Sequence, residues 1–398
     1  MAFTLSFAYL IGGRIPYFIF YTSLVLVVIG FLWARIIGRI TAVCYTEASS
    51  AQVGGKVKVL IEVKNLTGWP VPWVQYWVQM PATFGLPDNL ACYTFSLAPH
   101  EKKTFSEMVE CRRRGIFTWG CGLLKTGDLF GTFVNSLSVG ELRELTVLPQ
   151  IFDLGHGLET MTGLRPGDSF WSRKAGRSGA SFMGVRKYDH GDGISRIHWK
   201  ASARSQNFLV KEFQKPKLLD CMLYLDLNEE NHAGEGPTGS AEKAVALIAS
   251  IAGAGIKAGY GIGLVVFGAG RGYIPIGYGK GHFALILQTL VRFGQAKGDD
   301  FGEALSHELA LLQRKCQVIA ATGCLNEKLV DGLLRAKLKG QYSSLFLLKL
   351  ESFADRETNL NERANCLDRL GAAGIPVVGI TKDSDLRLVF RGLEYEAG

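Results

Sequence analysis

The sequence predicts a membrane-attached protein of mixed α/β class, with a transmembrane segment, an immunoglobulin-like β-sandwich and a doubly wound parallel α/β domain. Three observations predict this fold. An uncharged apolar run lies near the N-terminus, short strand patterns follow from about residue 45, and apolar strands alternate with helical patterns from residue 218. The predicted regions are a membrane anchor over 1–40, a β-sandwich over 45–150, a Gly-rich basic linker over 151–217 and the α/β domain over 218–398.

The membrane anchor is predicted from Pro16–Trp33, eighteen residues without a charge. As a helix this run is about 27 Å long, and extension to Ile37 with Arg35 reaching the interface completes a bilayer crossing over about 16–37. Residues 2–13 are also uncharged but too few to cross alone, so we interpret them as a short or re-entrant first half of a hairpin. More arginines follow the run than precede it, which favours the inner cell membrane with residues from about 40 onward in the cytoplasm.

The β-sandwich is predicted from strand patterns at roughly 8–12-residue intervals without a helical stretch. Val57–Val63 alternates apolar and polar residues and is followed by a turn. The other predicted strands are Val71–Met80, Ala91–Leu97, Lys103–Glu110, Phe117–Trp119 and Leu145–Leu148.

The positive charge is concentrated in residues 171–217, which hold eleven Lys or Arg against three acidic residues and so carry the +8 of the whole chain. We predict a strand at Met183–Tyr188, a helix from about Ile194 to Arg204 and a strand at Phe208–Phe213. Asp192 is the predicted N-cap of this helix. Three basic residues repeat every four positions and form a predicted ridge, which is either a solvated face or a docking surface: Arg196, Lys200 and Arg204.

This stretch resembles the motif of the domain of unknown function 58 family, R-x-Y-x-x-G-D-x-x-x-R-x-[HD]-W-K-x-[ST]-A-R. The matching residues are Arg186, Tyr188, Gly191, Asp192, Arg196, His198, Trp199, Lys200, Ser202, Ala203 and Arg204. Upstream, Arg114-Gly115-x-Phe117 and Asp128-x-Phe130-Gly131 resemble further family elements. The resemblance implies a membrane anchor, a β-domain, a region similar to a von Willebrand factor type A domain, and action with a MoxR-type AAA+ ATPase.

The α/β domain is predicted from short apolar strands that alternate with helices. The strands are Leu218–Leu225, Gly261–Phe267, Gln317–Ala321, Ser344–Leu350 and Pro376–Ile380; the helices are 241–257, 281–293, 301–312, 326–338 and 359–372, with a hairpin at 271–278. Functional sites in such sheets lie at the carboxyl ends of strands. Those ends are Asp226, Gly268 and Thr322-Gly323.

The resemblance to type A domains implies Mg²⁺ bound through D-x-S-x-S after the first strand. This chain has Asp226, Asn228 and Glu230, so Asn and Glu replace both serines. Thr322-Gly323-Cys324 stands where a second-loop Asp is expected. We therefore expect no bound metal. The alternative is Mg²⁺ bound by oxygens of Asp226, Asn228 and Glu230.

Motifs for catalysis and cofactor binding are not found. The eight cysteines form no C-x-x-C and several lie inside the predicted α/β core, which favours a reducing cytoplasm. H-E-x-x-H, G-x-S-x-G and a dinucleotide fingerprint are missing. His198 lies near Lys200, but only Ser195 or Ser202 stands nearby as a nucleophile. We expect no catalytic residue, cofactor or small-molecule substrate, with a hydrolase as the alternative.

Two functional hypotheses follow. The first is a membrane-anchored, non-enzymatic interaction or scaffold protein that acts with a MoxR-type AAA+ ATPase. The second is a polyanion-binding module for anionic lipid or nucleic acid through the basic 171–217 segment. Nucleic acid is the less favoured ligand, because Trp199 alone is no stacking platform.

Overall fold

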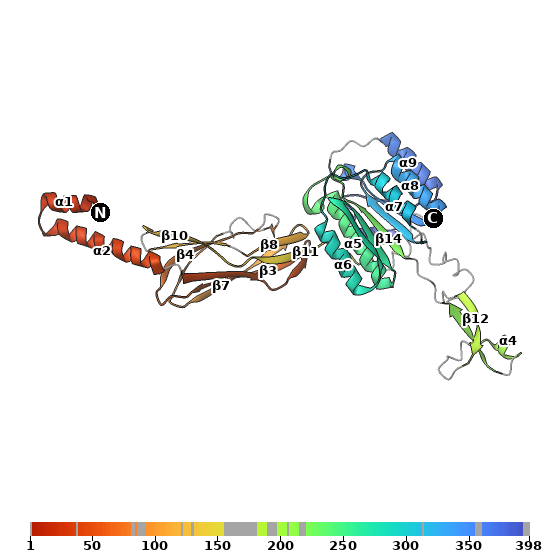
Figure 1. Cartoon of the computed structure of the whole chain (residues 1–398), viewed down its shortest axis with the longest axis horizontal. Coiled ribbons are helices and arrows are strands. Elements are labelled where there is room, and N and C mark those ends of the chain that lie inside the picture. The colour runs from red at the N-terminus through yellow and green to blue at the C-terminus, as the bar shows by residue number, and fades with distance from the viewer. Residues whose placement is uncertain are drawn as a thin grey trace. The chain divides into compact units, whose positions relative to one another are not determined.

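The computed structural model divides the chain into two compact units, residues 1–148 and 149–398 (Figure 1). It describes residues 2–36, 39–80, 84–85, 92–120, 122–128, 131–154, 181–188, 197–204, 207–214, 220–312, 314–354 and 360–392.

The first unit begins with the helix pair α1 (Ala2–Ile11) and α2 (Arg14–Ile36). Gly12 and Gly13 join them with φ angles of +65° and +88°, a left-handed conformation that glycine adopts without strain. The helices fold back on each other as the predicted hairpin. Within α2, Arg14–Trp33 is long and apolar enough to cross a membrane.

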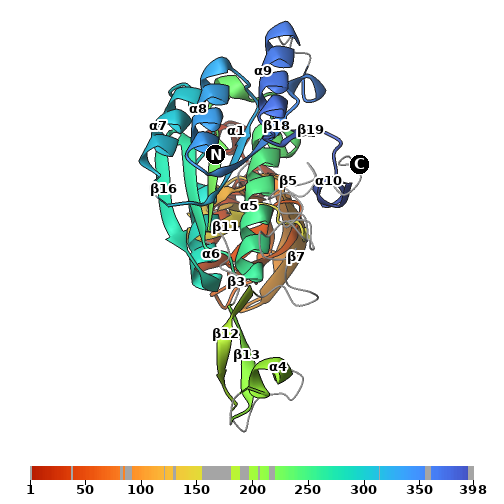
Figure 2. The same ribbon diagram turned by 90° about the vertical axis from the view of Figure 1, so that its right-hand side faces the viewer.

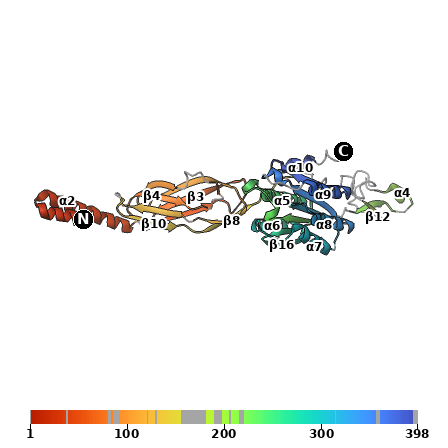
Figure 3. The same cartoon turned by 90° about the horizontal axis from the view of Figure 1, so that it is seen from above.

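The strands of this unit form two four-stranded sheets and a smaller third sheet. One sheet has the order β1-β3-β7-β5, the second β10-β9-β4-β6 and the third β2-β11-β8. Figure 3 shows the strands running alongside one another. Their bounds are β1 Ile40–Thr46, β2 Ser50–Gln52, β3 Lys56–Asn65, β4 Val71–Val78, β5 Phe84–Gly85, β6 Cys92–Leu97, β7 Lys102–Cys111, β8 Gly115–Trp119, β9 Gly122–Gly127, β10 Val134–Val139 and β11 Arg143–Leu148.

One hydrophobic core joins these sheets, which is the arrangement of a sandwich. Ile61 of β3 and Val74, Tyr76 and Leu124 of the second sheet are buried in the same cluster. The six predicted strands are confirmed within a few residues. Sequence patterns missed β1, β2, β5, β9 and β10. Strand β10 is short and mostly exposed, so it carries little apolar alternation.

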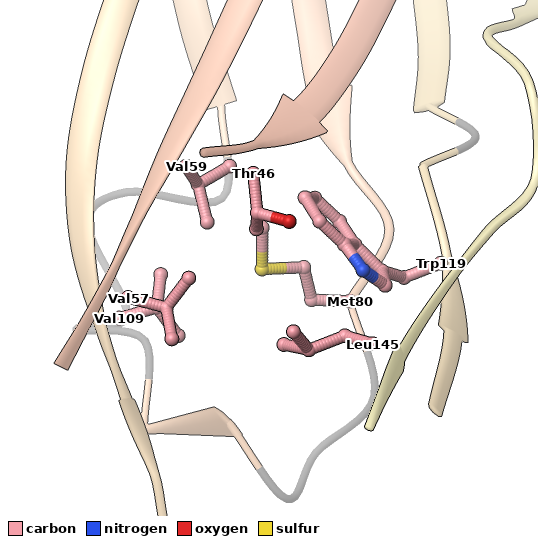
Figure 4. A pocket seen from close by; sticks show the side chains of 7 residues that line it. All are labelled: Thr46, Val57, Val59, Met80, Val109, Trp119 and Leu145. Carbon is pink, nitrogen blue, oxygen red and sulfur yellow. The ribbon is translucent and has the colours of Figure 1, made fainter. Parts of the chain in front are cut away.

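Figure 4 shows a small cavity in this core, lined by Thr46, Val57, Val59, Met80, Val109, Trp119 and Leu145. Its volume is about 10 Å³. Trp119 Nε1 is buried without a hydrogen-bond partner among the described atoms, and the Thr46 hydroxyl donates to the Ala48 carbonyl. A space of this volume is about the size of one water, so it is too small for a ligand.

The second unit contains a six-stranded sheet of order β16-β15-β14-β17-β18-β19. All neighbouring strands are parallel except the edge strand β16, which is antiparallel to β15. The strands are β14 Cys221–Asp226, β15 Ile262–Gly268, β16 Gly270–Gly277, β17 Gln317–Thr322, β18 Tyr342–Leu348 and β19 Val377–Ile380. The helices are α5 Ser240–Ala258, α6 Gly279–Arg292, α7 Phe301–Leu311, α8 Glu327–Leu338, α9 Leu360–Ala372 and α10 Leu386–Gly392.

Helices cover both faces of this sheet, as predicted for a doubly wound domain (Figure 1). Met222 and Tyr224 of β14 face one way and pack in a cluster with residues of α7, α8 and α9. The alternate residues Leu223 and Leu225 are also fully buried, on the face that α5 covers. Each predicted strand and helix is found within a few residues. Helix α10 was not predicted.

Candidate functional site

The motif region contains an antiparallel strand pair, β12 (Ser181–Lys187) and β13 (Leu209–Gln214) (Figure 2). Both strands confirm the prediction. The Tyr188 amide donates to the Phe208 carbonyl and continues the pairing past β12. The short helix α4 (Trp199–Ser202) lies beside the pair.

The helix predicted from about Ile194 to Arg204 is wrong over part of its length. Ile197 forms an antiparallel bridge with Val210 of β13 and is buried, and the His198 amide donates to the Leu209 carbonyl. Contact with a strand therefore replaces helical bonding at Ile197. The N-cap of α4 is His198, whose Nδ1 accepts a hydrogen bond of 3.2 Å from the Ala201 amide. The predicted N-cap, Asp192, lies outside the described residues.

The predicted basic ridge is not one helical face. Lys200 lies in α4, whereas Arg204 follows the C-cap Ala203. The Lys200 and Arg204 side chains are both exposed. Arg196 lies outside the described residues, as do Gly191 and Asp192. Arg186 lies in β12 opposite Val210.

Two motif residues hold α4 against β13. Ser202 Oγ accepts a 2.9 Å hydrogen bond from the Leu209 amide and donates to the His198 carbonyl at 3.1 Å. His198 supplies the cap described above. Both positions need a side-chain acceptor, which explains why the motif admits His or Asp at the first and Ser or Thr at the second.

Three aromatic side chains meet at this end of the strand pair, and we name Tyr188, Trp199 and Phe208 the aromatic cluster. The Phe208 ring centroid lies 6.1 Å from that of Trp199 and 6.4 Å from that of Tyr188, both edge to face. Trp199 is 60% exposed and Phe208 57%. Phe208 lies outside the matched motif and was not predicted as a site residue. Its only sequence signal is an aromatic residue at the start of a strand.

A second group of polar residues lies at the carboxyl end of β14. The Asp226 carboxylate is fully buried and accepts hydrogen bonds from the Asn228 amide (2.9 Å), Asn231 Nδ2 (2.8 Å) and Thr322 Oγ1 (2.6 Å). Burial raises the pKa of the Asp226 carboxyl, while His232 and these hydrogen bonds act in the opposite direction. The structure thus brings together two of the predicted strand ends, Asp226 and Thr322.

His232 extends this network to the next helix. One ring nitrogen lies 2.8 Å from the Asp226 carbonyl oxygen and the other lies 2.9 Å from Ser240 Oγ at the start of α5. The residues Asn231, His232 and Ser240 were not predicted as site residues, because their contacts depend on the path of the loop after β14. The network joins the end of β14 to the end of β17 and to the start of α5.

Each of the proposed oxygen ligands for a metal has protein partners. Asn228 Oδ1 accepts from the Glu230 amide at 3.2 Å, and the Asn228 side-chain nitrogen donates to the Gly298 carbonyl at 3.2 Å. The Glu230 carboxylate is 3.2 Å from Lys297 Nζ. Because these groups and Asp226 are directed at protein partners, the set does not fit Mg²⁺. The expectation that no cofactor binds stays a prediction.

A cleft of about 700 Å³ lies beside this network, lined by Asn228, Phe267, Gly268, Gly270, Arg271, Lys297, Gly298, Asp299, Asp300, Glu303, Ala304, His307 and Glu308. Many of its charged groups have protein partners. Arg271 pairs with the buried Glu308 at 2.6 Å, and Glu303 pairs with Lys328 at 2.8 Å. Asp300 caps α7 by accepting from the Glu303 amide. The cleft is thus bounded by ion pairs that hold α7 to β16 and α8.

Comparison with known proteins finds a family but no activity. Residues 184–347, from β12 to β18, match the model of a family described as "Protein of unknown function DUF58". The "Uncharacterized protein YeaD" of Bacillus subtilis is 24% identical over 374 residues, which cover 91% of this chain and 88% of that protein.

Two solved structures resemble parts of the chain. A CARDB domain from Pyrococcus furiosus, solved with di-metal ions, is 20% identical and covers 27% of this chain and 86% of its own, with a TM-score of 0.21. The open pilus adhesin SpaC of Lactobacillus rhamnosus GG is 11% identical and covers 58% of this chain and 36% of its own, with a TM-score of 0.34. Neither likeness bears on function.

Proposed function

The chain belongs to the DUF58 family, and we propose that it is a membrane-anchored, non-enzymatic interaction protein that docks a partner through the aromatic cluster. The observation that carries this proposal is the pair of rings, Trp199 and Phe208, that are more than half exposed. Large aromatic side chains gathered on a surface are typical of interaction sites, where they supply most of the binding free energy.

The support for docking comes from how the cluster is held. His198 and Ser202 fix α4 to β13, so Trp199 is presented from a hydrogen-bonded frame and little conformational entropy is lost on binding. Lys200 and Arg204 are exposed beside it and favour an acidic partner surface. We propose a MoxR-type AAA+ ATPase as that partner, on the strength of the family resemblance.

We also propose that the α/β unit is a von Willebrand factor type A-like domain. The support is a parallel sheet with one antiparallel edge strand and helices on both faces. Asp226 stands at the end of the central strand β14, although the rest of the metal motif is replaced. Such a domain would serve as a rigid body for protein contacts without a metal.

The test is association of the full chain, reconstituted in nanodiscs, with a purified MoxR-type AAA+ ATPase. We expect Trp199→Ala/Phe208→Ser to weaken crosslinked pull-down by at least tenfold, because truncating such residues costs about 2 kcal/mol or more. The matched control is Leu285→Ser on α6, a 47% exposed apolar residue away from the cluster. Equal capture by wild type and the double variant, with unchanged thermal unfolding, would contradict the proposal.

Polyanion binding is the second candidate, favoured by the exposed Lys200 and Arg204 next to the aromatic rings. If it is correct, the full chain in neutral-lipid nanodiscs will bind anionic vesicles or an oligonucleotide with an affinity that falls steeply as salt rises. Lys200→Glu/Arg204→Glu will then bind more weakly, whereas Lys280→Glu on α6 will not. A salt-insensitive affinity excludes this candidate.

A further inference from the structure

The segment between β3 and β4 has polar residues inside and apolar residues outside, the reverse of the usual pattern. Asn65 at the end of β3 is fully buried and Thr67 in the loop that follows is 7% exposed, whereas Leu66 is 46% and Trp69 56% exposed. An exposed Trp in a short loop is unfavourable in water. Leu66 and Trp69 together give this loop a small exposed apolar surface.

Hydrogen bonds prevent this loop from turning its apolar residues inward. Asn65 Nδ2 donates to the carbonyl oxygens of Trp69 (2.8 Å) and Ala98 (3.0 Å). Asn65 Oδ1 accepts from the Thr67 amide (2.9 Å) and from the Thr67 hydroxyl (2.7 Å). The polar side chains thus form the frame of the loop, and this frame holds Leu66 and Trp69 outward.

A second buried polar residue, Asp128, follows strand β9. Its Oδ1 accepts from the Phe133 amide at 2.8 Å. Its carbonyl oxygen accepts from Trp73 Nε1 at 2.9 Å. Val134, which follows Phe133 and begins β10, is 53% exposed. Asp128 belongs to the D-x-F-G element, so part of that element serves to shape the loop between β9 and β10.

Both loops lie against the last turns of α2. The Trp69 ring centroid is 6.0 Å from that of Trp33, and the Phe133 centroid is 6.0 Å from that of Phe31. A Cβ on Gly30 would lie only 3.2 Å from Asp128 Oδ2 and from the Phe133 ring, so glycine permits this approach. The loops are therefore at the level where the apolar stretch Arg14–Trp33 ends.

We propose that Leu66, Trp69 and Val134 insert into the interfacial layer of the lipid bilayer and seat the β-sandwich on the membrane. This inference rests on the membrane anchoring in the proposed function. Tryptophan favours the headgroup level, and the surface continues the lipid-facing surface of α2. Arg39 and Lys64 are exposed next to the first loop, which suits anionic headgroups.

The experiment places photoreactive benzoyl-phenylalanine at single positions of the full chain in nanodiscs containing anionic lipid. The seat positions are 66, 69 and 134. The control position is 77, because Trp77 is 40% exposed and lies at the other end of β4. A probe at position 24 in α2 tests membrane anchoring separately from insertion of the three seat positions. Mass spectrometry then detects lipid adducts.

We expect lipid adducts at the seat positions and at position 24, and none at position 77. Adducts at position 24 without any at 66, 69 and 134 would overturn the seat and leave the anchor intact. Missing adducts at position 24 would overturn the anchor itself. Crosslinks from position 69 to a second copy of the chain, in place of lipid, would assign this surface to self-association and also overturn the inference.

Discussion

Asp226 is a carboxylic acid fully buried at the end of a central strand, and its environment has opposing effects on its ionisation. Burial raises the pKa, and the hydrogen bonds from Thr322, Asn228 and Asn231 limit the rise. A carboxyl whose folded-state pKa exceeds its unfolded value holds its proton better in the folded protein. Its contribution to stability is complete below about pH 4 and is lost as pH rises through the raised pKa.

Asp226→Asn is therefore expected to remove a fall in stability with pH. In wild type, the free energy of unfolding should decrease from about pH 4 upward through the folded-state pKa of this group. The variant cannot titrate at this position. Its new side-chain amide faces the amide donor of Asn231, which lowers the free energy of unfolding at all pH values by about 1–3 kcal/mol. Urea unfolding of the full chain in detergent at several pH values measures both effects.

The control for this prediction is Asp299→Asn, which changes an exposed carboxylate in a nearby loop. It should leave the pH dependence as in wild type. His232 also lowers the pKa of Asp226, so a His232→Gln background separates its effect from that of the carboxyl itself. If the free energy of unfolding still falls with pH in Asp226→Asn as it does in wild type, another group causes this pH dependence.

At the scale of elements, α4 depends on contacts with β13 more than on its own helical propensity. A four-residue helix has too few internal hydrogen bonds to be stable alone. The sequence predicted a longer helix, from about Ile194 to Arg204, but Ile197 is buried by pairing with a strand. Apolar periodicity reports which residues are buried and does not say whether helix or strand buries them.

Ser202→Ala is expected to loosen α4 from β13 without unfolding the unit. It removes the acceptor of the Leu209 amide, at a cost of about 1 kcal/mol, so hydrogen exchange at Leu209 should rise roughly fivefold. Ser202→Thr keeps the hydroxyl and serves as the control. Equal exchange in wild type and the Ala variant would show that this hydrogen bond contributes nothing to the frame of the aromatic cluster.

At the scale of the whole molecule, α2 is the feature on which anchoring depends. Leu24 and Val28 lie near the middle of the apolar stretch and are exposed along the helix. Leu24→Lys/Val28→Lys places two charges where each costs about 2.5–3.5 kcal/mol in a bilayer. We expect the wild-type chain to resist carbonate extraction from membranes and the double variant to be released.

The comparison variant is Leu285→Lys, which adds a charge to an exposed position of α6 in the second unit. It should remain in the membrane fraction. Release of both proteins, or of neither, would show that α2 is not what holds the chain there.

By itself, the sequence determined the apolar helix, most of the strands and the order of strands and helices in the α/β unit. These features depend on residues close together in the chain, whose periodicity records burial along one element. The motif likewise marked the strand pair and its helix, although it overestimated the helix length.

Only the tertiary structure decided which side chains meet. Thr322 reaches Asp226 across 96 residues of sequence, and Phe208 joins Trp199 because β13 folds back beside α4. After β3, Asn65 lies inside and Trp69 outside because Asn65 Nδ2 donates to the carbonyl oxygen of Ala98, which is distant in the sequence. Such contacts depend on how loops fold in space, and composition and spacing along the chain do not specify that path.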